Sequence, residues 1–251
     1  MIHTFLFSPS GTTRKYAVAM TEAFGDDSQL IDLTHGACEV ECELVDGDTV
    51  LLLAPVYAGR IPEMAAKLFR QIDGHGMKAV VAVVYGNRDY DDALLELADI
   101  ATADGFKVIG AGAFIAQHCI FPKVASGRPD NSDFAKAVEF IRRANHSGQL
   151  DISTIKGNHP YKKAASTPLH PKVDKGKCRE CGKCARECPS GAISVENLYE
   201  TDAEKCISCC RCIGVCPDKA RCFGGLKYRL IAPLFKKMCS KRREPEWFIA
   251  E

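Results

Sequence analysis

Residues 178–189 read CRECGKCARECP, and residues 206–217 read CISCCRCIGVCP. Both stretches share one spacing, in which three cysteines follow at three-residue intervals and a fourth comes four residues later, directly before a proline. Three thiolates at this interval wrap one short loop around three iron corners of a cubane. The two copies therefore predict a pair of 4Fe-4S clusters, which would use eight of the 14 cysteines in the chain.

The fourth cysteine of each run is expected to bind the cluster of the other run, because the local loop reaches only three corners. The first cluster would be held by Cys178, Cys181, Cys184 and Cys216, and the second by Cys206, Cys209, Cys212 and Cys188. Zinc is the alternative, since CxxC pairs also bind zinc tetrahedrally. A zinc site needs neither the third interval nor the Cys-Pro ending nor a repeat of the whole pattern, so the spacing favours iron.

On these two runs, residues 172–222 resemble the bacterial dicluster ferredoxins. Residues 189–193 (PSGAI) follow the family pattern, whereas residues 217–221 (PDKAR) keep only its alanine. Cys210 lies inside the second run, and we expect it not to bind iron because its use would break the three-residue interval. The other cysteines are expected to pack as small hydrophobic residues, with a redox role as the alternative for Cys119.

Length and composition limit the remaining possibilities. The chain has 251 residues, 46% of them hydrophobic, which suffices for one medium domain and a small module. We expect no signal peptide and no transmembrane segment, because the start has no basic leader and apolar runs stay far below the ~20 residues that span a bilayer. So many thiols indicate a reducing cytoplasm, in an anaerobic or microaerobic organism. A net charge of +1 gives no reason to expect nucleic acid binding, and membrane contact is not expected.

Residues 1–145 alternate short apolar runs with longer amphipathic ones, which indicates a parallel α/β sheet. The run at 79–85 is apolar throughout, as expected for a strand covered on both faces. Expected strands are 2–7, 29–33, 49–54, 79–85 and 108–115, and expected helices are 12–24, 62–72, 91–103 and 132–144. Five strands with their helices are typical of a flavodoxin-like, doubly wound five-stranded parallel sheet.

Such sheets bind ligands at the carboxyl ends of their strands. The first loop expected there, residues 8–13 (SPSGTT), carries a hydroxyl at every position that is not proline or glycine. With the amides of the following helix, these hydroxyls suit a phosphate. The loop resembles the flavodoxin loop that binds the FMN phosphate, T-x-T-G-x-T, with serine replacing the first two threonines. It implies contacts from Ser8, Ser10, Gly11, Thr12 and Thr13; an ordinary hydroxyl-rich helix cap is the alternative.

Two further loops, residues 55–62 (PVYAGRIP) and 86–91 (GNRDYD), each place a tyrosine at the same edge. In flavodoxins these loops enclose the isoalloxazine ring. The resemblance implies FMN contacts from Pro55, Val56, Tyr57, Ala58 and Gly59, and from Gly86, Asn87 and Tyr90. Tyr57 and Tyr90 are expected to stack on the ring. Either tyrosine could instead cover the top of the sheet, and this alternative is stronger for Tyr90.

The chain is thus divided into an FMN-binding flavodoxin-like domain (1–145), a linker (146–171), an α+β dicluster ferredoxin domain (172–222) and a basic amphipathic tail (223–251). The tail is expected to form a short helix that packs its apolar stripe on its own protein. Docking onto the acidic first domain is a refinement of this interpretation, and attachment to a membrane surface is the weaker alternative. The stripe consists of Leu226, Leu230, Ile231, Leu234, Phe235 and Met238.

This order of parts is similar to fused flavodoxin-ferredoxin proteins of anaerobic bacteria and archaea. The resemblance implies an intracellular electron-transfer protein that couples FMN to two 4Fe-4S clusters and exchanges electrons with redox partner proteins. Two alternatives remain: a flavin-dependent reductase of a small substrate fed by the clusters, and a dicluster ferredoxin whose first domain only docks. No catalytic residue is assigned, because the chain shows no NAD(P)H fingerprint and no acid–base pair beside the flavin loops.

Overall fold

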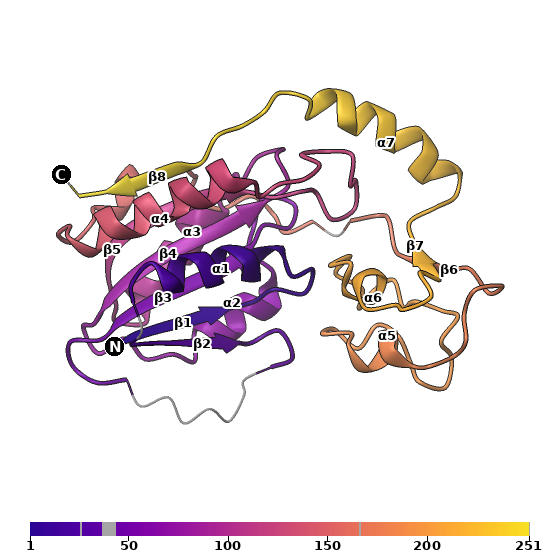
Figure 1. Ribbon diagram of the computed structural model, residues 1–251, viewed down its shortest axis with the longest axis horizontal. Coiled ribbons are helices and arrows are strands. Elements are labelled where there is room, and N and C mark those ends of the chain that lie inside the picture. The colour runs from indigo at the N-terminus through magenta and orange to yellow at the C-terminus, as the bar shows by residue number, and fades with distance from the viewer. Residues whose placement is uncertain (26, 37–43, 166, 251) are drawn as a thin grey trace.

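Short apolar runs alternate with amphipathic helices in the first half of the chain, and they form a sheet covered on both faces (Figure 1). The computed structural model describes residues 1–25, 27–36, 44–165 and 167–250. Five strands run parallel in the order β2-β1-β3-β4-β5, which is the flavodoxin order, so the predicted fold class is confirmed. They are β1 (Ile2–Leu6), β2 (Ser28–Asp32), β3 (Thr49–Pro55), β4 (Lys78–Tyr85) and β5 (Lys107–Ile115).

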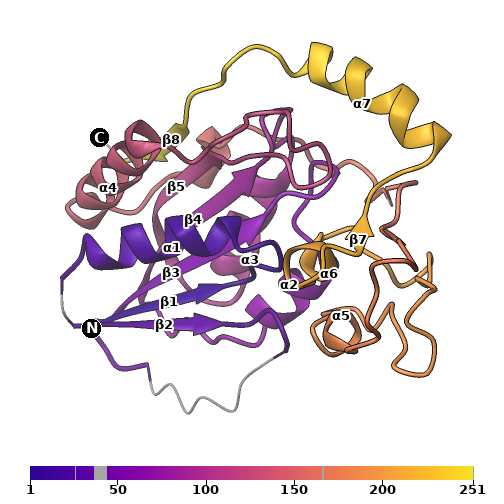
Figure 2. The ribbon, with the colours of Figure 1, turned by 45° about the vertical axis from the view of Figure 1, so that its right-hand side comes forward.

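Two helices lie on each face of this sheet (Figures 1 and 2). Helices α1 (Thr12–Glu22) and α4 (Asn131–Asn145) cover one face, and α2 (Glu63–Phe69) and α3 (Ala93–Ala103) cover the other. Strand β4 is apolar throughout because both of its faces are buried: Val81 and Val83 join the core under α2 and α3, whereas Val80 and Ala82 join the core under α1 and α4.

A sixth strand, β8 (Glu246–Ile249), lies antiparallel beside β5 at the edge of the sheet. The sequence predicted five strands and a tail without a strand, so this part of the prediction is corrected. Residues 246–249 extend the sheet because β5 would otherwise leave a row of unpaired backbone groups at its edge.

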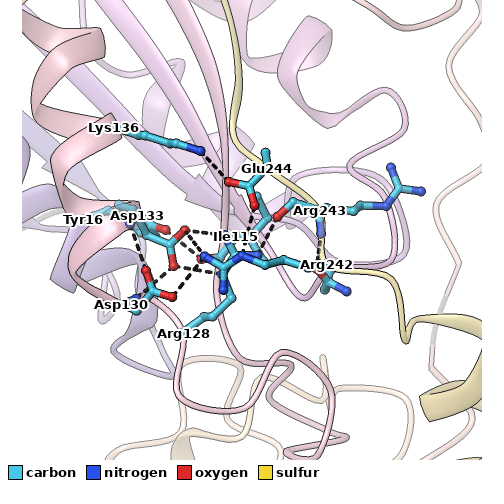
Figure 3. A network of polar contacts seen from close by, with 10 residues as sticks. Tyr16, Ile115, Arg128, Asp130, Asp133, Lys136, Arg242, Arg243 and Glu244 are labelled. Carbon is cyan, nitrogen blue, oxygen red and sulfur yellow. Dashed lines mark hydrogen bonds and ion pairs between the residues drawn. The ribbon is translucent and has the colours of Figure 1, made fainter.

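Polar contacts fasten the chain that leads into β8 to the loop before α4 (Figure 3). Arg128 is buried and donates through Nε to Asp133 Oδ2 at 2.8 Å and through Nη1 to the carbonyl of Arg243 at 2.7 Å. Arg242 pairs with Asp130 at 3.0 Å. Since Asp133 is fully buried, its charge is compensated by Arg128 rather than by water.

The cysteine-rich module lies beyond the carboxyl ends of the parallel strands (Figures 1 and 2). Strands β6 (Lys172–Val173) and β7 (Arg221–Cys222) pair antiparallel, and α5 (Lys183–Arg186) and α6 (Arg211–Gly214) are single turns. Among its described residues, the linker that precedes the module contains one 3₁₀ turn, η1 (Ile152–Thr154). The module therefore faces the edge of the sheet where a ligand is expected.

Helix α7 (Leu226–Met238) confirms a helix in the tail, but only one of its two apolar sides is packed. The ring of Phe235 stacks on that of Phe121 with centroids 4.5 Å apart, and Tyr228 stacks on the same ring. The other side is exposed by 61–75%, so the expectation that the whole stripe packs on the protein is wrong for Leu226, Leu230, Leu234 and Met238. Among the described residues, no helix is long and apolar enough to cross a membrane.

Candidate functional site

A cavity of about 390 Å³ opens at the carboxyl ends of the parallel strands. Residues of the three loops predicted from the sequence contribute to its wall: Ser10, Thr12, Pro55, Val56, Tyr57, Ala58, Gly59 and Gly86. The segment after β5, the linker, α7 and residues 207–208 of the second cysteine run complete it. Its size is typical of a pocket for a small ligand or cofactor.

The first loop has the features of a phosphate site. Gly11 takes a left-handed φ of 82°, so the chain turns sharply into α1. Ser8 Oγ accepts a hydrogen bond from the backbone N–H of Arg14 at 2.8 Å, so this hydroxyl caps the helix. The hydroxyls of Ser10 and Thr12 lie 3.0 Å apart on the cavity wall.

Thr13 provides the test of fit for the phosphate. The side chain is fully buried, and its hydroxyl has no hydrogen-bond partner among the residues that the structure describes. A buried hydroxyl without a partner costs about 1–3 kcal/mol, and a phosphate oxygen at this helix start would remove that cost. The loop therefore fits the phosphate of a flavin nucleotide.

Tyr57 lies where the second loop turns back on itself. The backbone N–H groups of Tyr57 and Arg60 donate to each other's carbonyl oxygens at 2.8 and 3.1 Å. This tight turn requires left-handed backbone at Ala58 (φ 52°) and Gly59 (φ 88°). The Tyr57 hydroxyl is buried without a described partner, and burial raises its pKa well above the ordinary value, with a further contribution from Cys209. Tyr57 is thus a neutral aromatic side chain between the cavity and the cysteine-rich module.

In the third loop, Tyr90 and Asn87 do not lie where the sequence predicted them. Tyr90 is fully buried, packs edge-on against Tyr85 and donates its hydroxyl to Glu246 at 2.6 Å. Asn87 donates through Nδ2 to the carbonyls of Cys239 and Lys241, both at 2.9 Å. The structure therefore does not bring Tyr90 or Asn87 to the cavity, because the C-terminal segment engages both side chains.

The segment after β5 contributes a histidine that was not singled out from the sequence. Its position shortly after the carboxyl end of β5 was the signal in the sequence that could have identified it. His118 lines the cavity, and its Nδ1 accepts from the backbone N–H groups of Ile120 and Phe121 at 3.2 and 3.3 Å. Burial, aided by Arg88, lowers the pKa of His118 to about 4. At neutral pH the ring is therefore uncharged, and Nε2 holds the proton as a donor.

The eight cysteines of the two runs border two separate small cavities. One is lined by Cys178, Cys181, Cys184 and Cys216, and the other by Cys188, Cys206, Cys209 and Cys212. These are the two sets that the crossed arrangement requires, although their binding of iron stays a prediction.

Burial raises the pKa of Cys209 and of Cys212 to about 12. Binding of a metal would have to displace these protons. Each cavity is bordered by four cysteines of the two runs, which is the number of thiolates that a 4Fe-4S cluster takes, so the donor sets fit two clusters.

Cys210 borders the second cysteine cavity as well, but its thiol is directed elsewhere. It donates to the carbonyl of Ser208 at 3.5 Å. Cys119 packs against the apolar cluster that contains Cys210, and this neighbourhood lowers the pKa of Cys119 and raises the pKa of Cys210.

The cavity at the strand ends, which is the predicted flavin cavity, and the second cysteine cavity share a wall. Ile207, which follows Cys206 in the second run, lines both of them. Ser208 also lines the flavin cavity, and its hydroxyl donates to the carbonyl of Leu169 at 2.7 Å, which ties this loop to the linker. The two predicted cofactor sites are therefore neighbours.

Two protein-family models match the chain. A flavodoxin domain model matches residues 5–96, and a 4Fe-4S binding domain model matches residues 171–194. No curated protein matches the sequence.

Similar solved structures cover mainly the first part of the chain. Flavodoxin 1 from Bacillus cereus is 16% identical over 59% of this chain and 99% of its own, with a TM-score of 0.44. The flavodoxin from Fusobacterium nucleatum bound to flavin mononucleotide is 16% identical over 57% and 96%, with a TM-score of 0.43.

The rubredoxin:oxygen oxidoreductase from the anaerobe Desulfovibrio gigas is 14% identical over 56% of this chain, with a TM-score of 0.41, and the match spans 34% of that longer protein. The flavodoxin domain implies a flavin, and the 4Fe-4S binding domain implies an iron-sulfur cluster. The chain therefore joins a flavodoxin domain to a 4Fe-4S binding domain, and its role is electron transfer.

Proposed function

We propose that this chain carries FMN and two 4Fe-4S clusters in a row, with the cluster of the second cysteine run in the middle. Ile207 and Ser208 carry the proposal, because residues of a predicted cluster loop also form the wall of the predicted flavin cavity. FMN supplies chemistry that exchanges one or two electrons, whereas each cluster exchanges one.

Each cavity residue has a role that follows from its placement. Ser10 and Thr12 on the cavity wall would hold the phosphate, helped by the buried Thr13 behind them, and Tyr57 would cover the ring on the side of the cysteine-rich module. His118 would donate a hydrogen bond from Nε2 without carrying a charge at neutral pH. Gly86 admits this histidine, since a Cβ there would lie 2.6 Å from the His118 ring.

The other cluster would be the exit to a partner protein. Cys181 is exposed, whereas Cys209 and Cys212 are buried. Lys183 and Arg186 are exposed beside Cys181, and Arg186 donates to the Cys181 carbonyl at 2.9 Å, whereas Arg179 is paired with Asp218. The two unpaired cations suit an acidic redox partner protein, with contact rates that fall as salt is added. Eight thiols committed to iron support a reducing cytoplasm as the location.

The first test is composition. Protein purified without oxygen is expected to contain about one FMN and about eight irons per chain. Four irons would contradict the second cluster, and the absence of FMN after reconstitution would leave a ferredoxin with a docking domain.

The order of the centres is tested by removing one cluster at a time. In Cys209→Ala, an external one-electron donor is expected to reduce the outer cluster at the normal rate but the flavin only slowly. In Cys181→Ala, both remaining centres are expected to respond slowly. If the flavin is reduced at the wild-type rate in Cys209→Ala, electrons reach it directly and the proposed row is wrong.

A further inference from the structure

Helix α7 has an inner side that packs on the protein and an outer side that faces solvent. In both views it lies at the outer boundary of the molecule (Figures 1 and 2). On the inner side, Tyr228 and Phe235 stack on Phe121, which lies in the segment after β5. The outer side carries apolar residues at intervals of four, which place them along one side of a helix. We call them the outer stripe: Leu226, Leu230, Leu234 and Met238.

The outer stripe concentrates the apolar surface that this protein exposes. Its four side chains are exposed by 61–75%. Among the residues that the structure describes, eight large hydrophobic side chains are exposed, and the outer stripe contains half of them. The other four lie singly at Met1, Val18, Val45 and Val195. Single exposed apolar side chains are ordinary, whereas a contiguous set indicates a binding surface.

The charge around the outer stripe has one sign. Residues 219–243 contain nine lysines and arginines and no aspartate or glutamate. Five of these cations lie on α7 or shortly after it, are exposed and form no ion pair with another described residue: Lys227, Arg229, Lys236, Lys237 and Lys241. Lys227 precedes Leu234 by seven residues and Lys237 follows Leu230 by seven, which is about two helical turns, so both lysines lie on the side of the stripe.

We propose that α7 docks on the surface of an anionic lipid bilayer, parallel to it, with the outer stripe among the upper acyl chains and the cations at the lipid phosphates. A bilayer presents an apolar layer below a layer of negative charge, which matches both features of this side of the helix. The long stems of lysine and arginine let the charged ends reach the phosphates while the leucines are buried. Membrane attachment was the weaker alternative from the sequence, because the protein itself was expected to cover the stripe.

A groove on a partner protein is the other conceivable occupant of this side. Such a groove would have to place acidic groups on its rim for Arg229 and Lys236, and also on its floor for the two lysines within the stripe. Fluid lipid meets apolar and cationic side chains without a fixed arrangement of groups, so the mixture on α7 favours the bilayer.

Docking through α7 would bring the predicted flavin cavity close to the membrane surface. Phe235, on the inner side of the same helix, is part of the cavity wall. The cavity would therefore lie about one helix diameter, ~10 Å, from the lipid headgroups.

Sedimentation of the holoprotein with lipid vesicles tests the docking. Vesicles of phosphatidylcholine mixed with an equal amount of phosphatidylglycerol should carry the protein into the pellet, whereas vesicles of phosphatidylcholine alone should leave it in solution. Added salt should release it, because salt screens the attraction between the cations and the phosphates. The assay counts protein in the pellet and uses no cofactor chemistry, so its failure is distinct from failure of the proposed function.

Variants of exposed residues separate the two parts of the surface. Leu230→Gln combined with Leu234→Gln keeps a high helix propensity and should weaken vesicle binding about tenfold or more. Val195→Gln, at a side chain that is exposed by 60% in the cysteine-rich module, is the matched control and should bind as the wild type does. Lys237→Gln should weaken binding about fivefold, whereas Lys15→Gln, at an exposed lysine of α1, should not.

Three results would overturn the proposal. Equal binding of the wild type to both kinds of vesicle would remove the role of the cations, and wild-type binding by the double leucine variant would remove the role of the outer stripe. Absence of binding to anionic vesicles at low salt would leave an acidic partner protein as the occupant. All substituted side chains are exposed, so circular dichroism of the variants should match that of the wild type.

Discussion

Thr13→Val should move stability and flavin affinity in opposite directions. Both side chains are branched at Cβ and similar in shape, so helix α1 should tolerate the change. In the flavin-free protein the valine removes a fully buried hydroxyl that has no described partner. Because such a group costs about 1–3 kcal/mol, we expect the free energy of unfolding to rise by about 1–2 kcal/mol.

The same substitution removes a hydrogen bond to the phosphate when flavin binds. A hydrogen bond to a charged group contributes about 1.5–3 kcal/mol, so the dissociation constant for FMN should rise roughly 10- to 150-fold. Denaturant unfolding of flavin-free protein measures the first effect. Quenching of FMN fluorescence during titration of the same protein measures the second.

Thr21→Val in the same helix is the matched control. The Thr21 hydroxyl is partnered, since it donates to the carbonyl of Ala17 at 2.7 Å and lies 2.7 Å from the Thr4 hydroxyl. Its loss should lower stability by about 1–3 kcal/mol and leave FMN affinity unchanged. Wild-type affinity in Thr13→Val would refute the phosphate assignment. A loss of stability in flavin-free Thr13→Val would show that the hydroxyl has a partner.

Three further predictions concern the second flavin loop, the clusters and acid stability. In Gly59→Ala the new Cβ would clash with an Asp91 carboxylate oxygen, so FMN affinity should fall about tenfold or more. Gly47→Ala, with φ 97° and open space around it, should bind FMN normally, and equal affinities of the two variants would contradict this prediction. Cys188→Ala should keep about four irons and lose the signal of the downstream cluster in electron paramagnetic resonance, and loss of the upstream one would disprove crossed ligation. Burial lowers the pKa of His118 from 6.5 to about 4, so the unfolded chain binds the extra proton in that window and stability should fall by up to ~3 kcal/mol as pH drops from 6.5 to 4. His118→Asn should flatten this part of the pH profile of flavin-free unfolding, and an unchanged profile would rule out His118 as its source.

The sequence alone sufficed for the parts that depend on local spacing. The interval between cysteines fixes which thiols one loop can offer to a cluster, and the alternation of apolar runs with amphipathic ones fixes a parallel α/β sheet. The position of residues 8–13 and 55–59 at strand ends follows from that alternation. The structure confirms the fold class and brings residues of both loops to one cavity.

Contacts between distant segments could not be derived this way. Residues 246–249 pair with β5, and carbonyl groups of the segment before them accept hydrogen bonds from the Asn87 side chain. Several other parts of a chain could pair with an open sheet edge or with a side-chain amide, so the sequence does not say which part does. Glu246 likewise accepts a hydrogen bond from the Tyr90 hydroxyl, which keeps this tyrosine away from the predicted flavin cavity. The sequence also could not show that α7 is buried on one side only, because apolar residues lie on both of its sides.

The sequence by itself therefore determined the cofactor classes and the sheet, because these depend on residues a few positions apart. Only the tertiary structure decided that residues 207–208 form part of the predicted flavin cavity and that Cys119 and Cys210 join one apolar cluster. Both contacts depend on how the cysteine-rich module packs against the strand ends. That packing is the sum of many weak contacts between segments about 90 residues apart, which no spacing within the chain reveals.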